Sequence, residues 1–200
     1  MRENEDAKGD VEIVGRILDG ETDAFASLLS KYGDYVAGIV KRHVPYEEIA
    51  DTAHEVFVRA YESLPTFKGT GGFQPWLASI AVRTCFDYWR ARYRSREVPL
   101  SALTERHREW LENALSGEAV GMCSENESRK EGKEILDWAL NRLPAEERMV
   151  LELVYLQEYS VKEAAALLGW TAANVKVRSF RARRKLRVLL SRMSERGERQ

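Results

Sequence analysis

Apolar residues recur at helical spacing through most of the 200-residue chain, and no stretch alternates strictly between apolar and polar positions as a half-buried strand would. This pattern predicts an all-α fold. In the N-terminal half it places helices over residues 11–19, 21–40, 45–64 and 76–96. The first ten residues are polar and strongly charged, and we expect them to be disordered.

Two segments interrupt the helical pattern. Residues 65–75, PTFKGTGGFQP, contain three glycines and two prolines, which predicts a loop. Residues 97–132 are polar, with Gly and Ser toward their end, a composition typical of a flexible linker; a short helix is expected around 106–115. Helical spacing resumes near Lys133, and a further helix is predicted from Pro144 to about Tyr159. The chain is therefore expected to form two helical domains joined by a linker.

The stretch 158–187 predicts two short helices joined by a tight turn. Ser160 and Glu163 have the S-x-x-E spacing of a capping box at a helix N-terminus. Gly169 follows the first helix, where a residue of positive φ commonly ends a helix, and Thr171 can cap the second. These signals together predict a helix-turn-helix.

The second of these helices has two different faces. At about 100° per residue, one narrow inward stripe is formed by Val175, Ser179, Ala182 and Leu186. The opposite face carries Val177, Phe180, Arg181 and Arg184, with Lys176 and Arg187 at its edges. From 176 to 192 there are eight basic residues and no acidic one. Such a face suits the DNA major groove, although a basic surface helix of an ordinary bundle is the alternative.

The net charge of −1 conceals a segregation of charge along the chain. Residues 97–141 carry five basic and ten acidic side chains, whereas residues 142–200 carry thirteen basic and seven acidic ones. The sequence contains no apolar run long enough to predict a membrane span, and the polar N-terminus does not resemble a secretory signal. Cys85 and Cys123 are far apart, which fits a reducing cytoplasm and argues against a zinc site or a disulfide framework.

A second candidate for nucleic-acid binding lies in the glycine loop and the helix after it. Phe67 and Phe73 flank the glycines, and Trp76 follows. Positions 83–96 then hold five basic residues against Asp87 alone, interleaved with four aromatic residues. Arginines beside flat side chains suit unpaired bases. The alternative is that the aromatic residues belong to the core and the arginines form a solvated helix end.

Several motifs of this chain resemble those of bacterial sigma factors of the extracytoplasmic-function (ECF) group, in the sigma-70 family. DTAHEVFVRAY at 51–61 and FQPWLASIAVR at 73–83 are similar to patterns in the first domain of that family. LPAEER, YSVKEAAALLG and VKVRSFRARRKL are similar to patterns in its second domain. Both domains occur in the family's order, and the resemblance covers residues 20–96 and 134–190.

The resemblance implies an alternative sigma factor that binds core RNA polymerase and directs promoter recognition, promoter melting and transcription initiation. It implies a tail and first short helix at 1–20, sigma region 2 at 21–96, an acidic linker at 97–132, sigma region 4 at 133–192 and a disordered tail at 193–200. The implied partners are promoter DNA, the clamp and flap of the polymerase, and an anti-sigma factor. No catalytic residue, cofactor or metal is implied.

The family's functional positions can be carried over residue by residue. Contacts with the polymerase clamp are expected from Asp51, His54, Glu55 and Arg59. Contacts with the melted −10 element are expected from Phe67, Lys68, Phe73, Trp76, Arg83 and Arg90. Contacts with the −35 element are expected from Asn174, Lys176, Val177, Arg178, Phe180, Arg181 and Arg184.

Four positions depart from the family pattern. His54 replaces the usual Gln, and Arg83 replaces the usual Asn. In the DNA-reading helix, Val177 stands where Ser is common and Ser179 where a buried Leu or Ile is common. The sequence therefore leaves open whether Ser179 or Val177 faces the core.

Two other classes of protein are considered. A helix-turn-helix transcription regulator could carry the same C-terminal helix pair behind an N-terminal domain that senses a ligand or a partner. An enzyme reading rests on Asp51 and His54, a carboxylate and an imidazole at i, i+3, as in carboxylate-bridged metal bundles. Such a site needs a second carboxylate–His pair, and none is apparent, so we expect His54 to be a surface residue.

Overall fold

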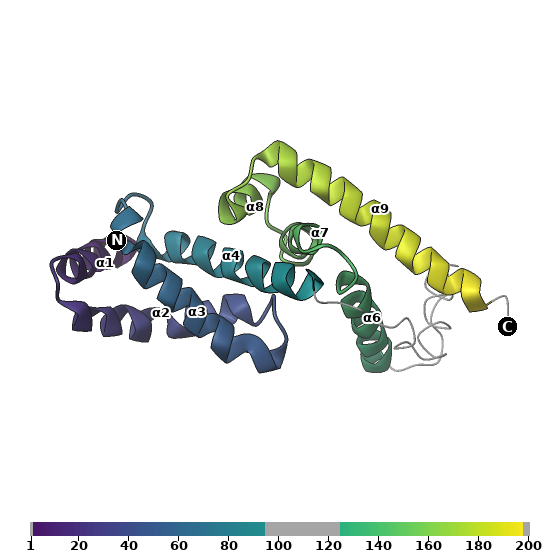
Figure 1. Cartoon of the computed structure of the whole chain (residues 1–200), viewed down its shortest axis with the longest axis horizontal. Helices are drawn as coiled ribbons and strands as arrows, with labels where there is room; N and C mark the ends of the chain where they lie inside the picture. The colour runs from purple at the N-terminus through teal and green to yellow at the C-terminus, as the bar shows by residue number, and fades with distance from the viewer. Residues whose placement is uncertain (1, 95–124, 198–200) are drawn as a thin grey trace.

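The computed structural model describes residues 2–94 and 125–197, with side chains for 9–93 and 130–191. All regular secondary structure in these two ranges is helical, which confirms the all-α prediction. The helices form two modules, and α4 lies between α2 and α3 on one side and α7 and α8 on the other (Figure 1). The predicted linker and its short helix at 106–115 fall largely outside the described residues.

The N-terminal module consists of α1 (Arg2–Leu18), η1 (Thr22–Ala24), α2 (Phe25–Val40), η2 (Tyr46–Glu48), α3 (Ile49–Ser63), η3 (Leu64–Thr66) and α4 (Phe73–Arg94). The prediction of disorder before Val11 was wrong, since α1 begins at Arg2. Asp10 helps to anchor this helix, because its carboxylate accepts hydrogen bonds from Tyr32 Oη at 2.5 Å and Lys31 Nζ at 2.7 Å. Long-range contacts of this kind cannot be read from local composition.

The predicted start of the fourth helix also changes. We expected it at Trp76, but α4 begins at Phe73 and contains Pro75 in its first turn. Proline is tolerated there because the first backbone N–H groups of a helix have no intrahelical acceptor. Phe73 thereby moves from the loop into the core, where it is 1 % exposed.

The C-terminal module consists of α6 (Glu125–Leu140), α7 (Ala145–Leu151), η5 (Glu152–Leu156), α8 (Val161–Leu168) and α9 (Ala172–Gly197). Three boundaries differ from the prediction. The helix α6 starts eight residues before Lys133, inside the predicted linker. The helix after Pro144 changes at Glu152 into a π-helical turn. The last helix continues to Gly197 instead of ending at 192.

The two modules share one apolar core. Val56, Leu77 and Cys85 of the N-terminal module belong to the same buried cluster as Met149 and Leu168 of the C-terminal module. The helix α4 makes this connection, since it packs against α7 and α8 as well as α2 and α3. The arginine-rich helix is therefore covered by the module that carries the helix-turn-helix.

The buried thiol of Cys85 gives a direct test of this packing. Burial, together with the negative charge of Glu152, raises the pKa of Cys85 to about 12. In a Cys123→Ser variant we expect Ellman's reagent to leave Cys85 unmodified at pH 8 until the protein is unfolded, because the thiolate is the reactive form.

The same shift sets a pH dependence. Between the ordinary thiol pKa of 9.0 and the native value of about 12, the folded state holds a proton that the unfolded state has lost. The free energy of unfolding should therefore fall as pH rises through this window, and less so in a Cys85→Ala variant. In the experiment with Ellman's reagent, modification of Cys85 as fast in the native protein as in the unfolded chain would contradict its buried position.

Candidate nucleic-acid interface

The helix-turn-helix predicted from the sequence is present in α8 and α9. Ser160 and Glu163 form the capping box, with Ser160 N–H donating to Glu163 Oε2 at 2.9 Å and Glu163 N–H to Ser160 Oγ at 3.3 Å. Gly169 ends α8 at φ 70°. Thr171 Oγ1 accepts from Asn174 N–H at 3.2 Å and so caps α9. Local sequence signals thus account for both helix ends at the turn.

The buried face of α9 is the stripe expected from its periodicity. Val175 and Ala182 are fully buried, and Ser179 is 5 % exposed. The Ser179 hydroxyl lies 3.0 Å from Tyr155 Oη, so this buried polar atom has a hydrogen-bonding partner. Val177 is 49 % exposed. The structure therefore decides the open question: Ser179 faces the core and Val177 faces outward.

The outward face of α9 combines positive charge with apolar surface. Phe180 is 62 % exposed, and Lys176, Arg181 and Arg184 are exposed beside it. The exposed Val177 side chain lies on the same face, so this face presents both apolar and positively charged groups. Five of the seven predicted −35 residues therefore lie on one accessible helix face.

The other two residues of that set, Asn174 and Arg178, are engaged within the module. Arg178 Nε donates to Asn174 Oδ1 at 2.8 Å, and its guanidinium lies 4.9 Å from the centre of the Trp170 ring. Both side chains are half-buried. This arrangement can position the start of α9 relative to Trp170.

The glycine loop holds a cluster of aromatic rings. Phe67, Phe73 and Trp76 lie with ring centres 5.2 to 5.5 Å apart. Phe73 forms the buried centre of this cluster and also contacts Tyr32. Phe67 and Trp76 are only half-buried, and Lys68 is exposed next to them. The accessible surface of the cluster is therefore provided by Phe67, Trp76 and Lys68.

The two predicted arginines of α4 are exposed but have different neighbours. Arg83 Nε donates to the backbone carbonyl oxygen of Leu167 at 3.2 Å, so it contacts the end of α8. Arg90 Nη2 lies 3.1 Å from Asp87 Oδ1, and its guanidinium stacks over Phe86 at 5.7 Å. Neither arginine is brought next to the aromatic cluster of the loop by a described contact.

An acidic groove of about 500 Å³ lies between α3 and α4. Asp51, Glu55 and Asp87 line it, and Arg59 bridges two of them through Nε–Glu55 Oε1 and Nη1–Asp87 Oδ2, both 2.7 Å. Burial alone would lower the pKa of Arg59, but the two carboxylates outweigh it and raise that pKa. Arg59 therefore organises the acidic groups of the groove.

His54 is exposed on α3, as expected of a surface residue, and does not line this groove. Among the described residues, no three His, Cys, Asp or Glu side chains are grouped in a way that could hold a metal ion. Within the same ranges, no helix has the length and apolar character needed to cross a membrane.

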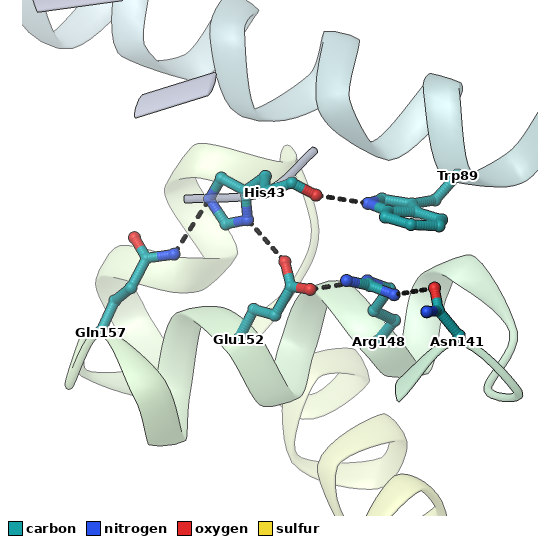
Figure 2. Close-up of polar contacts among 6 residues, drawn as sticks. All are labelled: His43, Trp89, Asn141, Arg148, Glu152 and Gln157. Carbon is teal, nitrogen blue, oxygen red and sulfur yellow. Dashed lines mark hydrogen bonds and ion pairs between the residues drawn. The ribbon is translucent and has the colours of Figure 1, made fainter. Parts of the chain in front are cut away.

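A polar network between the modules was missed by sequence reasoning (Figure 2). Glu152 accepts hydrogen bonds from Arg148 Nε and from His43 Nδ1, both at 2.6 Å. His43 Nε2 lies 3.1 Å from Gln157 Nε2, and Arg148 stacks on Trp89 at 3.6 Å from the ring centre. The local signal for this network was the charged i, i+4 pair of Arg148 in α7 and Glu152 in η5, which flanks the apolar residues 149–151.

One helical module has an exposed basic face on a helix-turn-helix. The other has an arginine-rich helix that follows an aromatic loop. Both features are typical of a DNA-binding protein. Comparison with family models makes the class specific. Sigma-70 region 2 matches residues 28–95, and sigma-70 region 4 matches residues 133–186.

Two curated sequences and one solved structure are similar to this chain. The ECF RNA polymerase sigma-E factor of Escherichia coli (strain K12) is 33% identical over 177 residues, which cover 87% of this chain and 90% of that protein. The sigma-E factor of Haemophilus influenzae is 29% identical over 174 residues, covering 87% and 91%. A solved structure of CnrH in complex with the cytosolic domain of CnrY has 24% identity and a TM-score of 0.48, covering 90% of this chain and 95% of that one.

The chain belongs to the ECF sigma factors of the sigma-70 family. It is an alternative sigma factor that directs transcription initiation, and this assignment is favoured over a regulator with a sensory N-terminal domain. Sigma factors are known as initiation factors without a catalytic role.

Proposed function

We propose that this protein binds core RNA polymerase in the cytoplasm and brings it to promoters with two DNA elements, without a catalytic activity or cofactor of its own. Region 2 is assigned to 21–96 and region 4 to 133–192, with 97–132 as the connection. The observation that carries the proposal is the exposed basic face of α9 in a chain that also matches region 2. Family membership adds an anti-sigma factor as a further partner.

For the −35 element, the proposed reading surface is the outward face of α9. Lys176, Arg181 and Arg184 supply positive charge for phosphates and guanine edges. Val177 and Phe180 supply exposed apolar surface, which suits thymine methyl groups. We assign Asn174 and Arg178 a positioning role beside Trp170, because both are engaged within the module.

For the melted −10 element, the proposed surface is the aromatic loop with the exposed arginines of α4. Phe67 and Trp76 are half-exposed and can stack on an unpaired base, with Lys68 available for a phosphate. Arg83 and Arg90 extend the positive charge along α4. Phe73 acts from the core by supporting the two other rings.

For the polymerase, the proposed docking face is the acidic groove of α3 and α4, with His54 beside it. We expect a double Asp51→Lys, Glu55→Lys variant to bind core polymerase at least about tenfold more weakly. The reason is that two positive side chains would replace carboxylates that we propose to contact complementary positive charge on the polymerase. Fluorescence anisotropy of the labelled protein against core polymerase measures this.

The matched control is a double Asp23→Lys, Asp34→Lys variant, which changes net charge equally at exposed positions outside the groove. It should bind core polymerase like the wild type. Equal weakening of both variants would show a general charge effect and would remove the proposed docking face.

The proposed function is tested by run-off transcription. The protein is added to core polymerase lacking any sigma factor, with genomic DNA fragments as templates. We expect specific transcripts whose start sites share two upstream elements. A protein that binds duplex DNA but neither binds core polymerase nor supports any transcript would contradict the proposal.

A further inference from the structure

The first helix, α1, lies next to the proposed −10 reading loop, although it is not part of the match to sigma-70 region 2, which begins at residue 28. It packs against α2, α4 and η3 (Figure 1). The short helix η3 leads into the loop, and α4 follows it. Both ends of the loop at 67–72 are therefore in contact with a helix that lies outside the matched region.

Asp10 connects α1 to the aromatic cluster of the loop. Its carboxylate is 2 % exposed and accepts hydrogen bonds from Tyr32 Oη at 2.5 Å and from Lys31 Nζ at 2.7 Å. The buried ring of Tyr32 lies with its centre 5.3 Å from that of Phe73. Because a buried hydroxyl needs a partner, the bond to Asp10 fixes the orientation of Tyr32 beside Phe73.

Phe73 passes this contact on to the two rings that are proposed to meet DNA. The ring centres of Phe67 and Trp76 lie 5.5 and 5.2 Å from that of Phe73. Both rings are half-buried, so each has an accessible side. Aromatic pairs at such distances prefer defined relative orientations. The position of Tyr32 therefore influences how both accessible rings are presented.

The loop between these rings depends on outside contacts for its order. Gly69, Gly71 and Gly72 have φ values of 70°, 84° and 83°, and glycine loses more conformational freedom on ordering than any other residue. A second residue of α1 contacts this segment. A Cβ built on Gly69 would lie 3.5 Å from Val11 Cγ2, so the Val11 side chain lies against the backbone there. The helix α1 thus contacts the glycine segment as well as the buried side of the aromatic cluster.

We propose that Asp10 is a positioning residue for the capture of an unpaired base of the −10 element. It holds Tyr32 against Phe73 and thereby keeps the loop in the conformation that presents its accessible rings. A loop that is ordered before binding loses less entropy when it meets DNA, so its affinity is higher. Asp10 is buried and does not itself contact DNA. This inference rests on the proposed function in transcription initiation.

The test uses the full chain with Asp10→Ala, and with Asp10→Asn as the conservative variant. Asparagine keeps an oxygen that can accept from Tyr32 Oη, and the partly exposed Lys31 can turn toward water. The matched control is Glu147→Ala. It also removes a buried carboxylate paired with a lysine, since Lys185 Nζ lies 2.8 Å away, but it does so in the C-terminal module.

The first measurement reports the order of the loop in the free protein. Lys68 is exposed within the loop, so trypsin can cleave after it, and mass spectrometry identifies this cut among the others. Cleavage requires local opening of the backbone, and a less ordered loop is therefore cut faster. We expect faster cleavage after Lys68 in Asp10→Ala, and wild-type rates in Asp10→Asn and Glu147→Ala.

The second measurement reports DNA binding by the complex with core polymerase. The probe is a fluorescein-labelled single-stranded DNA that carries the −10 element of a promoter found by run-off transcription. Fluorescence anisotropy should show roughly 5- to 10-fold weaker binding for Asp10→Ala, because the rings are no longer held in place before binding. Asp10→Asn and Glu147→Ala should bind like the wild type, and all variants should keep their affinity for core polymerase.

The outcomes separate the positioning role from the function itself. If wild type binds polymerase and the probe, but a folded Asp10→Ala variant shows unchanged cleavage or unchanged DNA affinity, the positioning role is refuted and the function stands. Equal losses in Glu147→Ala or in Asp10→Asn also refute it. If Asp10→Ala fails to fold by circular dichroism, Tyr32→Phe decides by the same two measurements, because it keeps the ring and removes the bond to Asp10. If wild type binds neither polymerase nor the probe, the proposed function fails, and this inference fails with it.

Discussion

Replacing Arg181 by Ala is expected to lower the affinity of this protein for its −35 duplex by roughly 5- to 150-fold, or about 1–3 kcal/mol. Arg181 is exposed beside Phe180 on the outward face of α9. No acidic residue occurs between positions 176 and 192 to neutralise it along the helix. Electrophoretic mobility shift of polymerase–promoter complexes, repeated with the −35 element scrambled, measures the loss.

The scrambled duplex separates base reading from phosphate binding. If Arg181 contacts base edges, the substitution should reduce the difference in affinity between promoter DNA and scrambled DNA. An equal loss on both duplexes would assign Arg181 to phosphate instead. Lys185→Ala is the matched control on the same helix, because its Nζ is paired with Glu147 of α7 at 2.8 Å. Binding to core polymerase without DNA should be unchanged by either substitution.

Replacing Phe73 by Ala is expected to destabilise the protein by about 3–5 kcal/mol, the range for a fully buried aromatic residue. The ring is 1 % exposed and lies at the centre of contacts with Tyr32, Phe67 and Trp76. Domains of this size are stable by only about 5–15 kcal/mol, so the loss is large. Urea denaturation followed by circular dichroism measures it.

Two further variants decide whether Phe73 acts only from the core. Phe73→Leu keeps an apolar side chain in the site and should retain affinity for single-stranded −10 DNA in the polymerase complex. Phe67→Ala removes a half-exposed ring and should weaken that affinity while costing less stability. Loss of DNA affinity in a stable Phe73→Leu variant would instead show that this ring reaches the DNA in the promoter complex.

Several elements could be predicted because their signals are local. The capping box of Ser160 and Glu163, the positive φ of Gly169 and the buried stripe of α9 each depend on residues a few positions apart. Capping and helical periodicity act within one or two turns, so the chain itself specifies them. The motifs of both sigma regions could be read for the same reason.

Other features depended on distant contacts and were predicted wrongly or not at all. The helix α1 extends to Arg2, and Asp10 within it is tied to α2. Phe73 was placed in a DNA-binding loop, but it enters α4 and is buried. The glycine loop flanked by aromatic residues suggested that both flanking rings are accessible. Which ring is buried is decided by the packing of α2 against α4.

By itself, the sequence determined the helical class, the helix-turn-helix and the sigma-factor family, because periodicity, caps and motifs are properties of short segments. The tertiary structure decided between Ser179 and Val177 as the core-facing residue, where periodicity and the family pattern disagreed, and it alone brings His43 to Glu152 across 109 positions of the chain. The two alternatives differ by a rotation of α9 about its axis. In the structure the Ser179 hydroxyl is paired with Tyr155, so Ser179 is the residue on the buried side. The contact between His43 and Glu152 accompanies the packing of α4 against α7 and α8, and no local pattern encodes that packing.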